Sequence, residues 1–402
     1  MNLTEDTLRF IHAHRRDDVR SLALQARKYP AVDMPAAITQ IAGWQVAKEK
    51  VPTWGEAEDI LYPTHLSLEQ CSSEVTARYK TGIMARFRSE QDTLTDLTGG
   101  FGIDCSFLST GFRQATYVER QEALCNIASH NFPLLGLNHI TVYHEDSVRH
   151  LQTMAPVDWI FIDPARRDGH GGRTVAIGDC EPDVSALEEL LLEKAQHVLI
   201  KLSPMLDLTL ALNDLKHVQE AHIVSAGNEC KELLLVLGRE GSLPIEEIPI
   251  HCINLTSAQV PQTLTFTRRQ EKDCTCEYTS ALKAYLYEPN ASILKAGAYR
   301  SLSAIYKVEK LHPNSHLYTS DEYLRDFPGR KFRIVNSCGF SKKEVKELLK
   351  IEKKANLTVR NFPASVDELR KRLKLAEGGD TYLFATTLAN DKKALIYCLL
   401  AI

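Results

Sequence analysis

Apolar residues in the first part of the chain recur at the spacing of an α-helix. The positions that follow this spacing are Leu8, Ile11, Val19, Leu22, Leu24, Ile38, Ile41 and Trp44. Prolines at positions 30, 35, 52 and 63 interrupt the pattern, as they do between short helices. The spacing therefore predicts a helical N-terminal domain over residues 1–90.

From Leu94 the pattern changes to short β-rich runs that alternate with helical stretches. The runs are Thr116–Val118, Ile140–Tyr143, Trp159–Ile162, His197–Leu202, His222–Ser225 and Leu233–Leu237. This alternation is typical of α/β proteins, in which a mostly parallel sheet carries helices on both faces. It predicts an α/β domain over residues 91–240. The proline-containing stretch after Arg239 is then expected to be a loop at a domain boundary.

The rest of the chain predicts smaller α+β domains over residues 262–328 and 329–402. The pattern is mixed in the first of these and clear in the second. Expected strands of the second are Phe332–Val335, Leu357–Val359, Tyr382–Thr387 and Ala394–Leu399, the last two paired. Its expected helices are Lys342–Ile351, capped by Ser341, and Ser365–Leu375.

Composition indicates a reduced, cytoplasmic protein. Of the 402 residues, 44% are apolar and 25% are charged, as in soluble globular domains. No apolar run approaches the ~18 residues that cross a membrane, and the polar first residues are not those of a signal peptide. The 10 cysteines include no Cys-x-x-Cys pair, and so we expect neither a disulfide framework nor a bound metal.

The charge of the chain is unevenly distributed. The net charge is only −4, yet residues 330–374 contain 14 Lys or Arg and 5 Asp or Glu. A basic module on an acidic body favours an anionic partner. The alternative is a solvated helical face with incidental lysines.

A glycine-rich turn follows the first expected strand of the α/β domain. It reads Asp96-Leu97-Thr98-Gly99-Gly100-Phe101-Gly102. Glycines allow close approach of the backbone to a ligand, and a helix N-terminus behind them suits a carboxylate. Acids then stand at or just after the ends of the next strands, at Glu119, Asp146 and Asp163. Since the carboxyl ends of parallel strands line one crevice, Glu119 is expected to accept ribose hydroxyls and Asp146 an adenine amino group.

This series resembles the class I S-adenosylmethionine (SAM) dependent methyltransferases. Residues 96–102 are similar to their first motif, with Thr98 in place of the usual first glycine. The resemblance implies a Rossmann-like domain that binds SAM through Asp96, Thr98, Gly99, Gly100, Gly102, Glu119 and Asp146. A NAD(P)-dependent oxidoreductase is the competing interpretation, but its G-x-G-x-x-G spacing differs from the G-G-x-G found here.

The segment Asp163-Pro164-Ala165-Arg166 resembles the fourth motif of nucleic-acid methyltransferases. There, the acid or amide and a backbone carbonyl hold the target amine in line with the methyl group, so that alignment supplies much of the catalysis. The resemblance makes Asp163, Pro164 and Arg166 candidate catalytic residues, and we expect Arg167 to contact a substrate phosphate. Uracil-C5 methyltransferases share this motif but need a cysteine nucleophile after the next strand. Ser203 stands there, which favours direct transfer to nitrogen or oxygen.

The C-terminal residues 331–402 resemble the THUMP-like domain found behind methyltransferase domains of this kind, notably in Bacteroidetes. The resemblance rests on Val359–Pro363 and Glu377–Asp380, and Tyr287–Ala291 resembles the small ferredoxin-like domain of that family. Related THUMP domains deliver structured RNA, usually tRNA, to a catalytic domain. The resemblance thus implies an RNA substrate recognised by shape and phosphate contacts. The candidate substrate-binding residues in this domain are Lys342, Lys346, Lys353 and Arg360.

The sequence therefore predicts a SAM-dependent methyltransferase that acts on tRNA or rRNA at a base nitrogen. Its expected parts are a helical domain (1–90), a SAM-binding α/β domain (91–240), a ferredoxin-like domain (262–328) and a basic THUMP-like domain (329–402). An RNA-binding protein with a vestigial methyltransferase fold is the alternative from another class.

Overall fold

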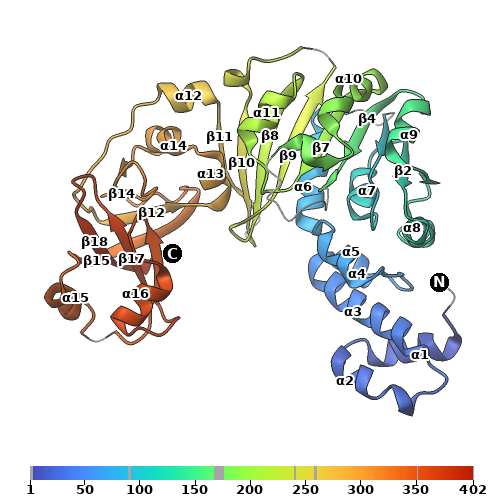
Figure 1. Ribbon diagram of the computed structural model, residues 1–402, viewed down its shortest axis with the longest axis horizontal. Coiled ribbons are helices and arrows are strands. Elements are labelled where there is room, and N and C mark those ends of the chain that lie inside the picture. The colour runs from blue at the N-terminus through green and yellow to red at the C-terminus, as the bar shows by residue number, and fades with distance from the viewer. Residues whose placement is uncertain are drawn as a thin grey trace. The chain divides into compact units, whose positions relative to one another are not determined.

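The computed structural model describes residues 3–88, 92–166, 176–239, 241–257, 260–350 and 352–401. The chain forms two compact units (Figure 1). Unit 1 comprises residues 1–219 and 233–243, and unit 2 comprises residues 220–232 and 244–402. The N-terminal helices thus belong to the same unit as the sheet that follows them.

Helices fill the first part of unit 1, as the apolar spacing predicted. They are α1 (Glu5–His14), α2 (Val19–Leu24), α3 (Met34–Lys50), α4 (Pro52–Glu56), α5 (His65–Gln70) and α6 (Glu74–Ala85). Side chains of Thr4, Asp18, Asp33 and Ser73 accept hydrogen bonds from backbone N–H groups in the first turns of α1, α2, α3 and α6. These caps satisfy donors that have no partner within the helix.

The sheet of unit 1 has the strand order β3-β2-β1-β4-β7-β9. The strands are β1 (Thr93–Asp96), β2 (Gln114–Glu119), β3 (Ile140–His144), β4 (Val157–Ile162), β7 (Ala195–Leu202) and β9 (Glu229–Gly238). Strands β3, β2, β1, β4 and β7 are parallel, and β9 runs antiparallel to β7. The helices of this region are α7 (Ile103–Leu108), α8 (Glu122–Leu134), α9 (Ser147–Thr153), α10 (Val184–Lys194) and α11 (Leu208–Asp214). The order reverses between β1 and β4, which is where ligands bind in open α/β sheets.

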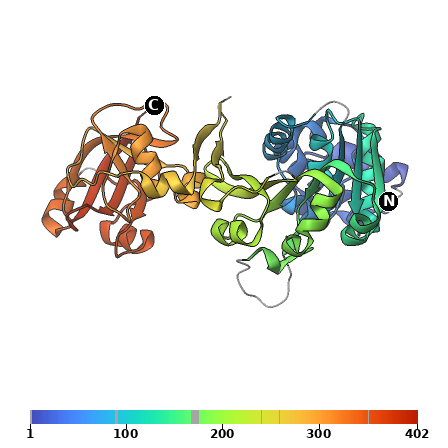
Figure 2. The same cartoon turned by 90° about the horizontal axis from the view of Figure 1, so that it is seen from above.

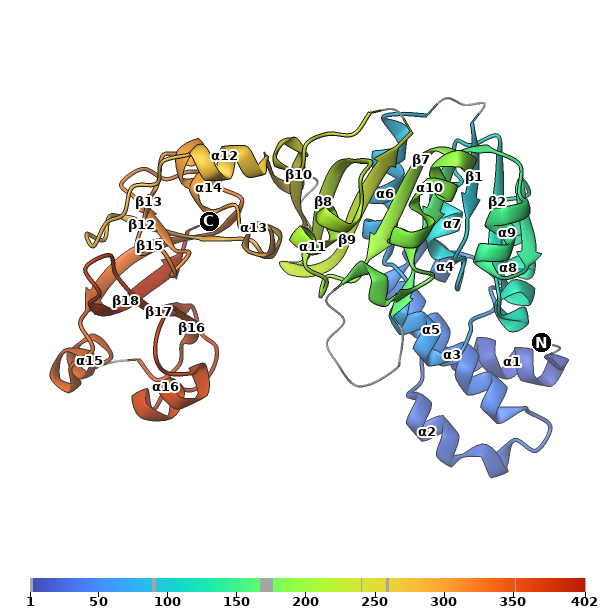
Figure 3. The same cartoon turned by 45° about the horizontal axis from the view of Figure 1, so that its top comes forward.

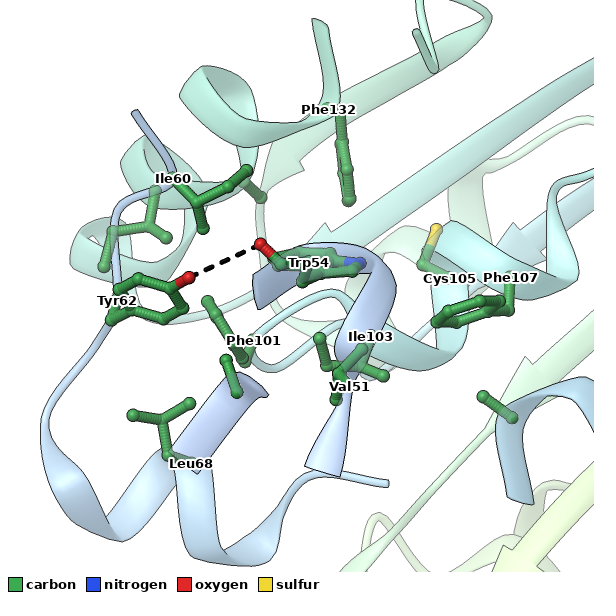
Figure 4. Packing of buried hydrophobic residues seen from close by; sticks show 14 of the residues in the cluster. Val51, Trp54, Ile60, Tyr62, Leu68, Phe101, Ile103, Cys105, Phe107 and Phe132 are labelled. Carbon is green, nitrogen blue, oxygen red and sulfur yellow. Dashed lines mark hydrogen bonds between the residues drawn. The ribbon is translucent and has the colours of Figure 1, made fainter. Parts of the chain in front are cut away.

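A buried aromatic cluster ties the N-terminal helices to the glycine-rich turn (Figure 4). Trp54 of α4 packs edge-on against Phe101 of the turn, with ring centroids 4.9 Å apart. The Trp54 indole N–H donates to Ser106 Oγ at 3.2 Å, and the Tyr62 hydroxyl donates to the Trp54 carbonyl at 3.4 Å. Phe132 of α8 closes the cluster. The N-terminal helices therefore support the turn from behind.

In unit 2, the stretch after Arg239 contains a strand where we expected only a loop. Strand β10 (Ile250–Leu255) pairs in parallel with β8 (Val218–Ala226) and antiparallel with β11 (Gln262–Phe266). Pro249 and Pro261 precede β10 and β11 rather than interrupt them, a position that strands tolerate. The loop prediction was wrong because prolines were read as a break in regular structure.

A second sheet in unit 2 has the order β13-β14-β12-β15-β18-β17-β16. The strands are β12 (Tyr285–Pro289), β13 (Glu309–Lys310), β14 (Tyr318–Ser320), β15 (Gly329–Cys338), β16 (Asn356–Arg360), β17 (Thr381–Thr387) and β18 (Lys393–Leu400). The red strand β18 lies between β15 and β17 (Figure 2) and is antiparallel to both. Since β12 pairs with β15, the expected ferredoxin-like and THUMP-like parts share one sheet.

The helices of unit 2 are α12 (Arg268–Asp273), α13 (Ala291–Ala296), α14 (Tyr299–Tyr306), α15 (Lys342–Leu348) and α16 (Val366–Leu373). Figure 3 shows α16 beside β16. Ser341 and Ser365 cap α15 and α16 by accepting hydrogen bonds from Glu344 N–H and Glu368 N–H. The two helices expected in the last part of the chain and the cap at Ser341 are thus confirmed, whereas Ser365, expected as the first residue of its helix, is the cap.

The cysteines are free thiols. Burial raises the pKa of Cys125 to about 11, and so this thiol stays protonated at neutral pH and packs as a small apolar side chain. Among the helices of the described residues, none is long and apolar enough to cross a bilayer.

Replacing Trp54 by alanine should cost about 3–5 kcal/mol of stability, because the indole fills the space between the helices and the turn. The measurement is the thermal or urea unfolding of the full chain. Leu24→Ala is the control, because Leu24 is 88% exposed and such changes stay within about 0.5 kcal/mol. Equal stabilities of the two variants would contradict the supporting role of the cluster.

Candidate active site

The glycine-rich turn connects β1 to α7 and lies against the end of β2. The Gly99 N–H donates to the Val118 carbonyl at 2.8 Å, and a Cβ on Gly99 would lie 2.1 Å from the Tyr117 ring. Gly100 and Gly102 have φ values of +54° and +92°, which side chains disfavour. The turn thus requires glycine at these positions for packing and for backbone conformation.

Thr98 joins the turn to the segment that follows β4. Its Oγ1 accepts a hydrogen bond from the Asp163 backbone N–H at 2.6 Å, and its own N–H donates to Asp96 Oδ1 at 2.9 Å. A glycine at position 98 has no side chain with which to make the first bond. The departure from the methyltransferase motif therefore adds a connection between the two candidate motifs.

Asp96 lies inside the protein at the end of β1, with 0% of its surface exposed. Its Oδ2 has no hydrogen-bond partner among the described residues. Burial raises the pKa of Asp96 well above its usual value, and the carboxylates of Asp104 and Asp163 raise it further. Asp96 therefore supports the turn from within the fold.

Glu119 ends β2 and is oriented by the backbone. Its Oε2 accepts from the Gly100 N–H at 2.9 Å, and its Oε1 accepts from the Gln121 N–H at 2.8 Å. A carboxylate has about four lone-pair sites, and so each oxygen can accept a further hydrogen bond. This arrangement is compatible with the expected contact to two ribose hydroxyls.

Asp146 follows β3 and is exposed. Its Oδ1 accepts hydrogen bonds from the N–H groups of Val148 and Arg149 at 3.0 and 3.1 Å. Asp146 is therefore the N-cap of α9. The expected contact between Asp146 and an adenine amino group stays a prediction. Such a contact has to use Oδ2, because Oδ1 caps the helix.

Asp163 directly follows β4, and its side chain, which is 36% exposed, faces Lys201 of the neighbouring strand β7. The Lys201 ammonium lies 2.5 Å from Asp163 Oδ2 and 3.2 Å from Asp104 Oδ2. Lys201 was not among the site residues expected from the sequence. The sequence did contain a signal, because Lys201 is a lone lysine within the apolar strand His197–Leu202. A buried cation is costly unless it is paired with an acid.

Asp104, at the start of α7, is the centre of this network. Besides Lys201, its carboxylate is 3.1 Å from the Lys80 ammonium, whose side chain is 0% exposed, and it accepts from Ser72 Oγ at 2.7 Å. Burial opposes the ionisation of Asp104, but Lys201 and Lys80 hold its pKa below the usual value. Two ammonium groups and the carboxylates of Asp104 and Asp163 thus neutralise one another.

The remaining candidates of the fourth motif are only partly described. Pro164 is buried, and the Arg166 backbone lies in β5 (Ala165–Arg166), which pairs with β6 (Cys180–Glu181). Arg167 and the Arg166 side chain lie outside the described residues. Ser203 Oγ accepts from the Met205 N–H at 3.3 Å and so takes part in a turn.

The basic candidates in unit 2 fall into two groups. Lys342, Lys346 and Lys353 are exposed. Arg360 instead donates to Glu288 Oε1 at 2.7 Å, and Arg330 Nε donates to Glu288 Oε2 at 2.7 Å. Glu288 is 2% exposed, so Arg360 neutralises a buried charge within the fold.

Strand order, glycine-rich turn and strand-end acids together define a Rossmann-like class I methyltransferase fold. The chain is 38% identical to a Porphyromonas gingivalis W83 protein whose crystal structure is described as that of a "putative methyltransferase", with 100% of both chains covered and a TM-score of 0.88. The chain belongs to the family of that protein. Residues 285–328 match a ferredoxin-like domain model and residues 329–399 a THUMP domain-like model.

Other similarities are much weaker. An rRNA methylase from Streptococcus thermophilus is 14% identical, with 40% of this chain and 95% of that chain covered and a TM-score of 0.31. A tRNA m1G37 methyltransferase from M. jannaschii is 12% identical, with 43% and 51% covered and a TM-score of 0.31. Scores this low add nothing to the assignment. Among curated proteins, none matches the chain.

Asp96 and Asp104 should respond to pH with opposite signs. The pKa of Asp96 is raised by folding, and so its ionisation costs stability as pH rises above about 3.9, its unfolded pKa. Asp96→Asn should therefore gain stability relative to the native protein between pH 4 and pH 7. The pKa of Asp104 is lowered by folding, and so its charge stabilises the protein above that same pH.

Asp104→Asn should thus lose about 3–5 kcal/mol at neutral pH, because Lys80 keeps a buried charge without its main counter-ion. The loss should be constant between pH 4 and pH 7 and should shrink as pH falls below about 3.9, the unfolded pKa. Thermal unfolding of Asp96→Asn between pH 4 and pH 7, and of Asp104→Asn below pH 4, measures the two trends. Parallel trends in the two variants would contradict the assigned pKa shifts.

Proposed function

We propose that this protein is a SAM-dependent methyltransferase that modifies RNA at a base nitrogen. The observation that carries the proposal is the placement of Asp163. Its backbone N–H is bound to Thr98 of the glycine-rich turn, and its Oδ2 is bound to Lys201. Both the backbone and the carboxylate of Asp163 are therefore held in place beside the glycine-rich turn. An acid fixed in this way is suited to the alignment of an acceptor amine.

The residues around the turn fit SAM. The described neighbour nearest to a Cβ built on Gly100 is the Thr98 carbonyl at 3.8 Å, and this open backbone can approach a ligand closely. Glu119 keeps acceptor capacity for ribose hydroxyls, and Asp146 is the candidate for the adenine amino group. When bound, SAM supplies an activated methyl group.

Asp163 would act by orienting the acceptor. Lys201 holds Oδ2, and Oδ1 makes no hydrogen bond to the described residues, which leaves it to accept from an amine. The Pro164 carbonyl is the second expected acceptor. A nitrogen with its lone pair oriented in this way needs no covalent activation, in keeping with Ser203 at the position of the C5-enzyme cysteine.

An RNA substrate is supported by the THUMP domain-like match and by the exposed lysines of the basic stretch. Lysines that neutralise phosphates bind RNA without reading its sequence. Two other functions differ from the proposed one in the cofactor that the protein would bind. An RNA-binding protein with a vestigial fold would not bind SAM, and a NAD(P)-dependent oxidoreductase would bind NAD(P) instead.

SAM or S-adenosylhomocysteine should raise the melting temperature of the protein, whereas NAD and ATP should not. At ~100 times its dissociation constant, a ligand that binds only the folded state adds about 2.7 kcal/mol. Glu119→Ala should abolish most of this shift because the ribose loses its acceptors. Glu122→Ala, an exposed glutamate on the adjoining helix α8, is the control and should keep it. A full shift in Glu119→Ala would remove Glu119 from the cofactor site.

Asp163→Ala should leave SAM affinity nearly unchanged and reduce methyl transfer by roughly 10² or more, since a misplaced acceptor reacts slowly. Asp163→Asn should keep part of the activity if accepting a hydrogen bond is the whole role, and Ser203→Ala should be mild. Single-turnover rates and melting temperatures are measured on the same samples. If Asp163 only pairs with Lys201, its loss lowers stability and leaves the rate per folded molecule intact, which would exclude the orienting role.

Reversing Lys342, Lys346 and Lys353 to glutamate should weaken RNA binding and flatten its dependence on salt. Each lost phosphate contact lowers the log–log slope by about 0.7–0.9. The control reverses Lys272, Lys307 and Lys392, which are exposed outside the basic stretch and change the net charge equally. Arg360 is kept in both variants because it pairs with Glu288. If both triple variants weakened RNA binding equally, the effect would come from the overall charge of the protein and not from the basic stretch.

A further inference from the structure

Two histidines and a glutamate meet on the paired strands β8 and β10 of unit 2. Glu220 and His222 are two residues apart on β8 and so point to the same face of the sheet. His251 of β10 is the direct neighbour of His222 in the parallel register. The fold therefore brings together three side chains whose sequence spacing contains no metal-ligand motif.

The ligand atoms of this Glu220–His222–His251 cluster converge. His222 Nε2 is 3.2 Å from Glu220 Oε1, and His251 Nε2 is 3.5 Å from Glu220 Oε2. One ligand atom from each residue lies within 4.8 Å of the other two. Atoms bound to one tetrahedral Zn²⁺ at about 2.0–2.1 Å are about 3.4 Å apart, and the two separations between Glu220 and the histidines are close to this value.

The His251 ring is held with one nitrogen turned to the cluster. Its Nδ1 is 2.9 Å from Thr265 Oγ1 of β11, whereas its Nε2 is buried and makes no hydrogen bond to the described residues. A hydrogen bond from Nδ1–H leaves the Nε2 lone pair for a metal, which is the usual orientation of a histidine ligand. The His251 side chain is 21% exposed, which provides access from solvent.

Protonation of both histidines in the cluster at the same time is unfavourable. The two imidazole rings stack with centroids 4.6 Å apart and an interplanar angle of 20°. If both rings were protonated, two cations would be stacked beside a single carboxylate, and like charges at this distance repel. Neutral rings that share a divalent cation avoid this repulsion.

We propose that Glu220, His222 and His251 bind one divalent transition-metal ion, with Zn²⁺ as the best fit. Imidazole nitrogens select Zn²⁺ and its neighbours over Mg²⁺ and Ca²⁺, which prefer oxygen ligands. Three protein ligands leave a fourth position open to solvent or to a further ligand. The site lies outside the proposed methyl-transfer site and does not depend on it.

The test is a calorimetric titration of chelator-treated full-length protein with Zn²⁺. The native chain should bind one ion tightly. His251→Ala and Glu220→Gln should each weaken this binding at least ~100-fold, since loss of an outer partner alone costs about 10–100-fold. Thr265→Val should weaken Zn²⁺ binding by only about 10–100-fold, with one ion still bound per chain. Thr265→Ser, which keeps the hydroxyl, should bind Zn²⁺ as tightly as the native chain. Because Thr265 is not a ligand, its two variants keep the test decisive if a ligand variant fails to fold.

The matched control is His217→Ala. His217 also pairs with a glutamate, its Nδ1 lying 3.1 Å from Glu188 Oε1, but it is not part of the cluster. Its loss should leave Zn²⁺ affinity unchanged. The proposal is overturned if the native chain binds no Zn²⁺, if His251→Ala binds it as well as the native chain, or if His217→Ala weakens binding equally.

Discussion

The buried charge of Asp104 is the constraint on which the arrangement of unit 1 depends. A carboxylate with so little solvent is stable only when cations replace the lost water. Lys80 of helix α6 and Lys201 of strand β7 supply these cations. Their ammonium groups lie 3.1 and 3.2 Å from the Asp104 carboxylate. Neutralising Asp104 therefore fixes the N-terminal helices, the helix after the glycine-rich turn and the strand beside Asp163 relative to one another.

Thr98 extends this network to Asp163, the acid proposed to orient the acceptor. Because Lys201 holds the Asp163 carboxylate and Thr98 holds its backbone, the acid is fixed at two points. Alignment of reactants is effective only when the aligning group is itself held. The same threonine belongs to the turn expected to bind the cofactor. A shift of that turn must then shift Asp163 as well, which would couple the position of the proposed cofactor to that of the proposed acceptor.

Local signals in the sequence predicted much of the fold but only part of the site. Strand β4, helix α15 with its Ser341 cap and helix α16 were expected because periodicity and caps act within a few residues. Strand β10 was missed because the prolines around it, among them Pro249 and Pro261, were read as a break in regular structure. Lys80 was missed because its partner is distant in the sequence. Its burial results from Asp104, which is 24 residues away in the sequence and adjacent only in the folded chain.

The count of basic residues in 330–374 also missed contacts between residues that are distant in the sequence. The 14 basic residues of 330–374 were counted as one surface, yet Arg330 and Arg360 both bind the buried Glu288. A buried glutamate between two arginines stabilises the shared sheet, since removing Glu288 would leave both arginines without their carboxylate. Lys342, Lys346 and Lys353 are exposed and pair with no buried carboxylate among the described residues. A polyanion can therefore use the lysines at no cost to the fold, whereas recruiting Arg360 would require Glu288 to lose a counter-ion.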